Sequence, residues 1–234
     1  MSGRTAVRSS IPVFERIAGS WAPRYRAASG GGHGLRARRD RLVELLGEGD
    51  GDLLDVGCGP AVMAGEVVSR GWRFVGVDGS RGMVRAGRAA LAEADLEGEV
   101  GVADAQALPF GAGAFSAVIC TGVLDGVPDR ERALAEMVRV LRPGGRLVVS
   151  FANRRSPYAL WTSGVYRPAV ERVLRRGPAG ERAPFLGAAA ALLWTPASAA
   201  EAVEATGATV DAVRHYYFNP CLPPLDELLP RAAG

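Results

Sequence analysis

The chain has 234 residues, of which 48% are hydrophobic and 23% charged, and its formal net charge is +3. This length and composition are typical of a globular protein with a sizeable core, and the charge is too small to indicate a nucleic-acid partner by itself. Three widely spaced cysteines exclude a Cys-x-x-Cys metal or redox pair and favour a reducing, cytoplasmic location. No apolar run has the form of a secretory signal or the length of a membrane-spanning helix.

The first fifth of the chain predicts helices. Apolar and aromatic residues recur at helical spacing from Val13 to Ala28 and predict one or two short helices, which Pro23 interrupts. Ser29–Gly34 reads SGGGHG and predicts a flexible joint, and a basic helix is expected over Leu35–Leu46. We expect residues 1–47 to form a helical lid.

Short apolar strands and helices then alternate, which predicts a parallel sheet covered on both faces. The expected strands are Asp52–Val56, Arg73–Val77, Glu99–Ala103, Phe115–Cys120 and Gly145–Phe151. The expected helices are Pro60–Arg70, Ser80–Ala94 and Asp129–Leu141. The fold class is therefore α/β, with a Rossmann-like sheet that binds its ligand within residues 52–151.

The alternation ends after residue 151. Residues 152–194 predict a helical substrate cap, and a helix is expected over Pro196–Thr206 with Thr195 as its N-cap. A final hairpin, Ala208–Arg214 with His215–Asn219, would extend the sheet to seven strands. We expect one domain, 1–234, in which 195–234 supply this last helix and hairpin.

The most informative stretch is Leu53–Ala61, which reads LLDVGCGPA. An apolar strand ends in an acid, a Gly-x-Gly turn follows, and Pro60 suits the first position of a helix. Such a turn lies at the carboxyl end of a parallel strand, where α/β proteins bind ligands. A turn without any ligand is the alternative, because a single Gly-x-Gly is weak support.

Three successive strands each carry an acid near the same edge of the sheet. Asp55 precedes the glycine turn, Asp78 ends the second strand, and Asp104 follows the third. A single acid at a strand end is usually a helix cap or a solvated loop residue. Three acids at one edge beside a glycine turn indicate a ligand site, and they could hold a ligand by an ammonium group, a ribose hydroxyl and an amino-purine.

Four ordered blocks give the chain a family resemblance. They are LLDVGCGPA, FVGVDGSRGMVRAGR, VADAQALPFGAGAFSAVIC and LRPGGRLVVS, and the resemblance runs from about Phe14 to Phe151. In this order and spacing they resemble the class I methyltransferases that use S-adenosylmethionine. The resemblance implies that cofactor and transfer of its methyl group to an acceptor.

The resemblance also implies roles for individual residues. The backbone of Gly57, Cys58 and Gly59 would pack against the cofactor, and Asp55 would organise the turn or reach the methionine ammonium. The other residues expected at the cofactor are, from the ribose to the methionine end, Asp78, Gly79, Ser80, Met83, Asp104, Ala105, Cys120, Thr121 and Tyr25. Of these, Asp78 would bind both ribose hydroxyls, Met83 would pack on the adenine, and Tyr25 would reach the cofactor carboxylate.

The chain departs from the family pattern at two places. Ala61 stands where many relatives have a third glycine, a change expected to leave the turn intact. After the fourth strand the chain reads TGVLDGVPD from Thr121, where many O-methylating relatives carry a histidine. His33 is our hypothesis for a general base if the acceptor is a hydroxyl, with a structural histidine as the alternative.

The acceptor is expected to be a small, apolar or aromatic molecule, plausibly of specialised or quinone-type metabolism, bound by aromatic side chains of the N-terminal helices and the cap. The methylated atom (O, N or C) and the oligomeric state stay open. A dinucleotide site is disfavoured because Val62 occupies the last position of its glycine pattern. Two other readings remain: an RNA, DNA or protein methyltransferase, suggested by the arginines at 36, 38, 39 and 41, and a fold that binds the cofactor without methyl transfer.

Overall fold

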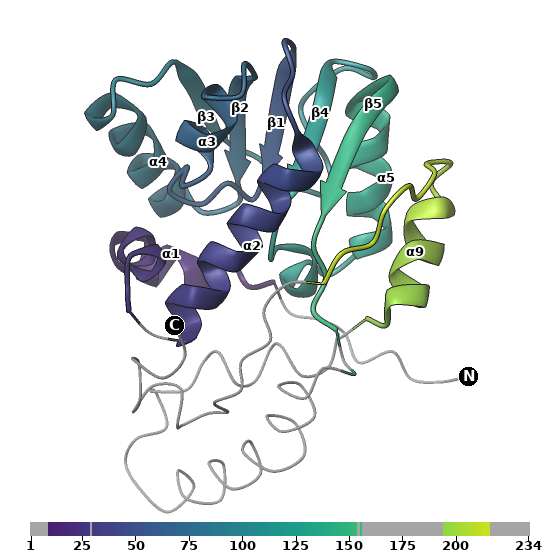
Figure 1. Cartoon of the computed structure of the whole chain (residues 1–234). Coiled ribbons are helices and arrows are strands. Elements are labelled where there is room, and N and C mark those ends of the chain that lie inside the picture. Colours follow the sequence, from purple (N-terminus) through teal and green to yellow (C-terminus); the bar gives the residue numbers. More distant parts are fainter. Residues whose placement is uncertain (1–8, 29, 154, 156–193, 216–234) are drawn as a thin grey trace, which may run out of the picture.

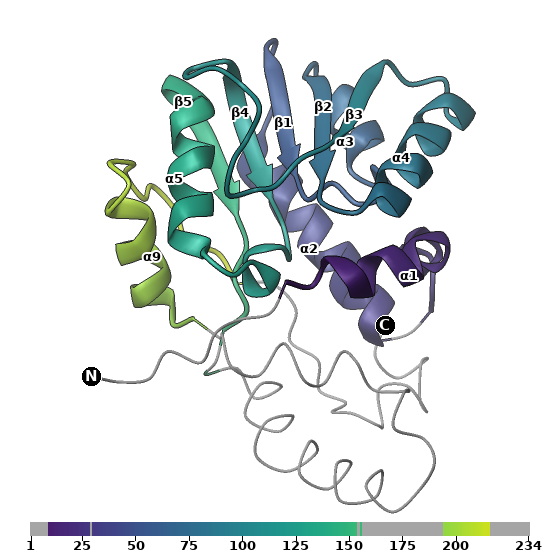
Figure 2. The ribbon, with the colours of Figure 1, turned by 180° about the vertical axis from the view of Figure 1, so that it is seen from behind.

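One parallel sheet organises the molecule. The structure is a computed structural model that describes residues 9–28, 30–153, 155 and 194–215. Its five strands lie in the order β3-β2-β1-β4-β5, and all neighbours are parallel (Figures 1 and 2). They are β1 (Asp52–Val56), β2 (Arg73–Asp78), β3 (Gly98–Val102), β4 (Phe115–Cys120) and β5 (Leu141–Val149).

Helices cover both faces of the sheet. The helical elements are α1 (Ile11–Trp21), η1 (Ala22–Tyr25, a 3₁₀ helix), α2 (Gly30–Leu46), α3 (Ala64–Val68), α4 (Arg81–Glu93), η2 (Leu124–Gly126, 3₁₀), α5 (Arg130–Val140) and α9 (Pro196–Glu204). Side chains of α2, α3 and α4 form one buried cluster with the sheet, and those of α5 and α9 form a second. The Rossmann-like α/β class is therefore confirmed.

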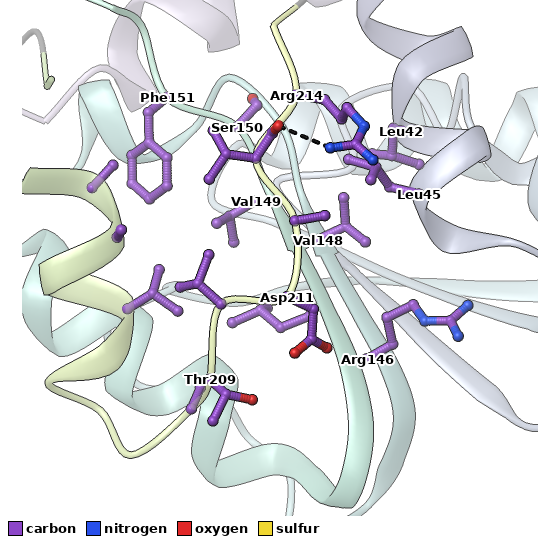
Figure 3. Close-up of a pocket in the computed structure, with 18 of the residues that line it drawn as sticks. Leu42, Leu45, Arg146, Val148, Val149, Ser150, Phe151, Thr209, Asp211 and Arg214 are labelled. Atoms are coloured by element: carbon purple, nitrogen blue, oxygen red, sulfur yellow. Dashed lines mark hydrogen bonds between the residues drawn. The ribbon is translucent and has the colours of Figure 1, made fainter. Parts of the chain in front are cut away.

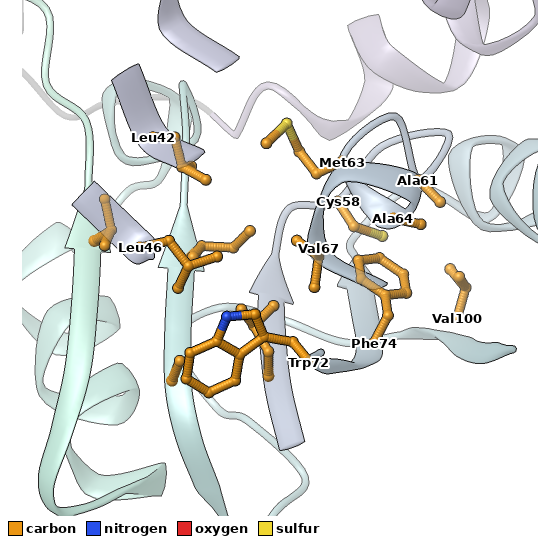
Figure 4. Close-up of a cluster of buried hydrophobic side chains, with 14 of the residues drawn as sticks. Leu42, Leu46, Cys58, Ala61, Met63, Ala64, Val67, Trp72, Phe74 and Val100 are labelled. Carbon is orange, nitrogen blue, oxygen red and sulfur yellow. The ribbon is translucent and has the colours of Figure 1, made fainter. Parts of the chain in front are cut away.

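Strand β1 shows how the sequence produces these two cores. Leu53 belongs to the cluster on the α2 face, whereas Leu54 and Val56 belong to the cluster on the α5 face, because successive side chains of a strand point to opposite faces. Trp72 and Phe74 complete the first cluster (Figure 4). The strand ends that carry the site are thus supported by a packed hydrophobic cluster on each face of the sheet.

The strand order also fixes where a ligand can bind. The chain goes from β1 outward to β2 and β3, and then returns to place β4 on the other side of β1. At such a switch point the connections leave in opposite directions and open a crevice at the carboxyl ends of the strands. This crevice lies between the ends of β1 and β4, directly after the glycine turn.

The predicted final hairpin is wrong for the part that the structure describes. Residues 208–215 form no strand, although they follow α9 and run beside β5. A strand requires a neighbour with which to exchange hydrogen bonds, and the described residues supply none on the outer side of β5. The described sheet therefore has five strands rather than seven, while the predicted cap falls almost entirely on residues 156–193, outside the described residues.

The predicted glycine joint is also wrong. Helix α2 begins at Gly30, so most of the SGGGHG run is helical. A Cβ on Gly32 would lie 2.1 Å from the carbonyl oxygen of Ala27, and the absence of side chains there lets α2 start against η1. The Arg36 guanidinium then donates to the carbonyls of Tyr25 and Ala27 at 3.0 and 2.9 Å, which closes the corner.

The turn after β1 is longer than expected. Helix α3 begins at Ala64, so Pro60 lies in the turn and not at a first helical position. Ala61 has φ +54°, a left-handed conformation that costs an alanine about 1–2 kcal/mol. The missing third glycine therefore leaves the turn in place but strained.

Candidate functional site

A cavity of about 220 Å³ lies at the carboxyl ends of β1, β2, β3 and β4. Eight of the residues expected at the cofactor line it: Gly57, Gly59, Asp78, Gly79, Met83, Asp104, Ala105 and Thr121. Of the three acids that the sequence analysis places at this edge, Asp78 and Asp104 line the cavity and Asp55 does not.

The glycine turn is fixed to the neighbouring strand. Gly57 and Gly59 both have positive φ, +74° and +54°, which glycine adopts without strain. The Gly57 and Cys58 N–H groups donate to the carbonyl oxygen of Val77 at 2.7 and 3.0 Å. A Cβ on Gly57 would lie 2.2 Å from a methyl group of Val123, so no other residue fits this position.

Asp78 is the best-placed acid of the site. Its Oδ2 accepts a hydrogen bond from the Gly59 N–H at 2.9 Å, and its Oδ1 accepts one from the Ser80 N–H at 2.8 Å. Burial raises its pKa, and these two N–H groups counteract part of the rise. Since each carboxylate oxygen has a second lone pair, Asp78 can accept two further hydrogen bonds, one per oxygen, from a diol.

The opposite end of the pocket combines an apolar wall and a polar loop. Met83 is 1% exposed, in the first turn of α4, where Ser80 accepts from its N–H as N-cap. Asp104 accepts from the backbone and side-chain nitrogens of Gln106 at 2.9 to 3.2 Å. Gln106 also lines the cavity, and no motif of the sequence had singled it out.

Helix α1, which lies within the predicted helical lid of residues 1–47, forms one wall of the cavity. Ile11, Phe14 and Trp21 line the cavity, and the rings of Phe14 and Trp21 pack edge to face with centroids 5.4 Å apart. The sequence shows the helical spacing of these side chains, but an apolar stripe does not reveal which surface of the protein it packs against.

Four of the residues expected at the cofactor lie behind the pocket wall and do not line it. Asp55 is 2% exposed, and burial, with the nearby Asp78 charge, raises its pKa to about 7, while Arg38 opposes the rise. The thiols of Cys58 and Cys120 are buried, which raises their pKa far above the usual value, so neither is an activated nucleophile. Ser80 acts as the cap of α4.

Tyr25 and His33 do not line the cavity either. The Tyr25 hydroxyl accepts a hydrogen bond from Arg38 at 2.9 Å. Arg38 in turn lies against the loop after β4, since a Cβ on Gly122 would be 2.2 Å from one of its nitrogens. His33 lies in the first turns of α2, so the prediction that it belongs to a flexible joint is wrong.

The loop after β4 contains Asp125, a buried acid that was not among the predicted site residues. The pKa of Asp125 is raised by burial to about 6. Its Oδ2 accepts a hydrogen bond from the Ala152 N–H at 3.3 Å, and its Oδ1 is buried without a hydrogen-bond partner among the described residues. The signal in the sequence is Asp125 itself, an acid between apolar residues in TGVLDGVPD, in the stretch where many relatives carry a histidine.

A larger cavity of about 670 Å³ lies beside β5 (Figure 3). Leu42 and Leu45 of α2, Val149 and Phe151 form part of its apolar lining, and residues 207–215 form another wall. Thr121 lines this cavity and the smaller one. The two cavities therefore both reach Thr121, directly after β4.

The described residues contain no metal-binding group of three or more His, Cys, Asp or Glu side chains. None of the helices in the described part is long and apolar enough to span a membrane.

Known proteins resemble this chain in sequence and in structure. Residues 54–149 match the family model of the methyltransferase domain. The chain is 35% identical over 127 residues to the ubiquinone/menaquinone biosynthesis C-methyltransferase UbiE of Geobacter sulfurreducens, covering 52% of this chain and 50% of that protein. It is 42% identical over 112 residues to a demethylmenaquinone methyltransferase of a Mycobacterium species, covering 47% and 46%. The chain thus spans about half the length of these curated relatives.

A solved structure supports the fold over a longer stretch. A SAM-dependent methyltransferase from Thermotoga maritima superimposes with a TM-score of 0.60 at 19% identity, covering 84% of this chain and 80% of that one. The strand order, the glycine turn, the acid at the end of β2 and the matched domain agree with one another. Residues 54–149 therefore match a methyltransferase domain, in agreement with the resemblance of the sequence to the class I methyltransferases that use S-adenosylmethionine.

Proposed function

We propose that the protein transfers the methyl group of S-adenosylmethionine to a small apolar acceptor. The observation that carries the proposal is the position of Asp78, whose two oxygens lie at the pocket wall between the N–H groups of Gly59 and Ser80. A carboxylate held in this way at the end of β2 is suited to a ribose diol.

The residues present fit this cofactor. Asp78 would bind the ribose hydroxyls, Met83 would pack on the adenine, and Asp104 would accept from the adenine amino group on its less occupied oxygen. The backbone of Gly57 and Gly59 leaves room for the cofactor chain. When bound, the cofactor supplies a methyl group already activated by its sulfonium.

The methionine end would lie near the loop after β4. Thr121 lines the pocket there, and Arg38 contacts Gly122 while Tyr25 accepts from Arg38. Tyr25, which the resemblance places at the cofactor carboxylate, would then act through Arg38, because a guanidinium binds carboxylates strongly.

The acceptor would approach from the larger cavity. Its lining of Leu42, Leu45, Val149 and Phe151 suits an apolar molecule, and the shared Thr121 connects it to the methyl-transfer site. The names of the two curated relatives favour a quinone-type acceptor. Since well-oriented reactants reach effective molarities of about 10⁵–10⁸ M, positioning alone supplies much of the rate.

A general base would add about 10²–10⁴-fold for an acceptor that must lose a proton. His33 stays our hypothesis for a hydroxyl acceptor. If it takes the proton, the His33→Ala variant should lower kcat for a hydroxyl acceptor by about 10²–10⁴-fold, and an unchanged kcat would remove His33 from the site.

The arginines of α2 do not favour a nucleic-acid substrate. Arg36 donates to two carbonyls of the chain, Arg39 pairs with Asp40, and Arg41 pairs with Glu44. Their charges are therefore used largely within the protein.

Ligand-induced stabilisation tests the cofactor site. A ligand that binds only the folded state raises the unfolding temperature, so S-adenosylhomocysteine should stabilise the wild type. The Asp78→Ala variant should lose this shift, whereas Asp52→Ala, at the start of β1 and far from the pocket, should keep it. Incubation of the wild type with methyl-labelled cofactor and quinone-type acceptors should then give a labelled product. A full shift with Asp78→Ala, or no methylated product from any acceptor class, would contradict the proposal.

A further inference from the structure

Helix α1 is attached to the rest of the molecule at the start of helix α4. Figures 1 and 2 show α1 beside α4, on the side of the sheet where the strands end. In the described residues its main packing partners are α4 and η1. The contacts between α1 and the start of α4 therefore hold this wall of the pocket in place.

One side chain makes most of the polar contacts of this attachment. Glu15 Oε2 accepts hydrogen bonds from the Ser80 hydroxyl at 2.5 Å and from the Gly82 N–H at 2.9 Å. Glu15 Oε1 lies 3.6 Å from the Arg85 guanidinium. The free N–H groups and the dipole of a helix N-terminus both favour a carboxylate here. The hydrogen bond from Ser80, followed by that from Gly82, lowers the pKa of Glu15.

Two glycines make the surface flat enough for α1 to dock. A Cβ on Gly79 would lie 2.6 Å from the Ile11 side chain, and a Cβ on Gly82 would lie 3.1 Å from that of Ala18. A side chain at Gly79 would require the end of the Ile11 side chain to move, and one at Gly82 would require α1 to shift slightly. Residues on both sides therefore determine how α1 docks: Glu15 on α1, and the glycines at the start of α4.

The same contacts lead directly to the pocket. Ser80, which donates to Glu15 through its hydroxyl, donates through its N–H to Asp78, and Asp78 also accepts from Gly59. The hydrogen-bonded chain thus runs from the glycine turn, through the acid proposed to bind the ribose, to α1. At its other end α1 is held by Ser10, whose N–H and hydroxyl both approach the Gly126 carbonyl, at 3.2 and 3.3 Å.

We propose that Glu15 is a positioning residue that latches α1 over the cofactor pocket, so that nucleoside entry and release require the Glu15 contacts with Ser80 and Gly82 to open. The inference rests on the proposed function. Ile11, Phe14 and Trp21 close one side of a cavity of only about 220 Å³, whereas ligand pockets commonly measure about 300–1,000 Å³. The other walls come from the ends of the strands, the first turn of α4 and the loops after β3 and around η2, and movement of α1 would enlarge the cavity.

Two measurements test the latch. The first is the dissociation rate of S-adenosylhomocysteine, followed by stopped-flow displacement. Hydrogen bonds to a charged group are stronger than neutral ones, so Glu15→Ala should release the ligand about 10-fold faster and Glu15→Gln, which keeps an acceptor oxygen, by less. Glu93→Gln, at the exposed C-terminal end of α4, should match the wild type.

The second measurement needs no ligand. Hydrogen exchange of the α1 amides at residues 11–21 should accelerate in Glu15→Ala, while the amides of β1 and β4 keep their protection, which shows that the variant is folded. An unchanged dissociation rate, or unchanged exchange in α1, would overturn the latch. If the wild type binds no S-adenosylhomocysteine, the proposed function is wrong, and the exchange result still decides whether Glu15 holds α1.

Discussion

The buried carboxyl of Asp55 should make the protein less stable as the pH rises. Its pKa is raised from 3.8 to about 7, chiefly by burial and further by Asp78, with Arg38 opposing. The folded protein then holds a proton at Asp55 that the unfolded chain releases between about pH 4 and pH 7. The free energy of unfolding therefore falls over this interval and is level above it.

The size of the effect follows from the same values. A pKa difference of this size corresponds to at most about 4 kcal/mol at pH 8, since one pKa unit is worth about 1.4 kcal/mol. The Asp55→Asn variant carries no such titration. We expect it to equal the wild type near pH 4 and to exceed it by up to about 4 kcal/mol at pH 8, or about 2–4 °C in unfolding temperature for each kcal/mol.

Denaturant unfolding at pH 4, 6 and 8 measures this difference, and Asp52→Asn on the same strand is the matched control. The Arg73 hydrogen bond lowers the pKa of Asp52, so that carboxylate adds stability above its ordinary pKa and loses it in acid. Its removal should therefore lower stability at pH 8, with the opposite sign. A wild type as stable as Asp55→Asn at pH 8, or a constant difference from pH 4 to 8, would mean that Asp55 is ionised and held by Arg38.

Three further predictions follow from other positions. Ala61→Gly should raise the free energy of unfolding by up to about 1 kcal/mol, because relief of the left-handed strain exceeds the entropy lost by glycine; a less stable variant in urea would contradict the strain. Asp125→Asn should match the wild type near pH 4 and exceed it by up to about 3 kcal/mol at pH 8, given its pKa of about 6; equal urea midpoints at pH 8 would refute this. Val149→Trp should raise the acceptor KM at least 10-fold without changing the affinity for S-adenosylhomocysteine, and an unchanged KM would exclude the larger cavity as the acceptor site.

Local sequence patterns predicted those helices and strands that are determined by interactions between residues close together in the sequence. The strands Asp52–Val56 and Phe115–Cys120 begin and end as predicted, because their apolar runs are bounded by turns. Thr195 caps the following helix through its hydroxyl, which accepts from the Ser198 N–H at 3.1 Å. Each of these strand ends and this helix cap is determined by residues within about four positions along the chain.

Contacts between distant segments were beyond such patterns. The glycines that begin α2 were interpreted as a flexible joint, whereas the close approach of η1 holds them in a helix. The docking of Glu15 on α4 joins residues more than sixty positions apart, so the sequence predicts a helical lid over residues 1–47 but not the contact that holds it. In the same way, the sequence placed Asp78 and Asp104 at the site but not Gln106, which reaches it through its hydrogen bonds to Asp104.

The outer side of β5 has a consequence for how copies of the protein meet. The described residues leave its row of backbone donors and acceptors without a strand partner, and such an edge can recruit the same edge of a second molecule. Here Arg142 is exposed, Pro143 lacks an N–H, and residues 207–215 lie beside the strand across the larger cavity. A second copy paired through a twofold axis would have to displace residues 207–215 and bring two copies of Arg142 together, and only the charge repulsion weakens as salt screens it.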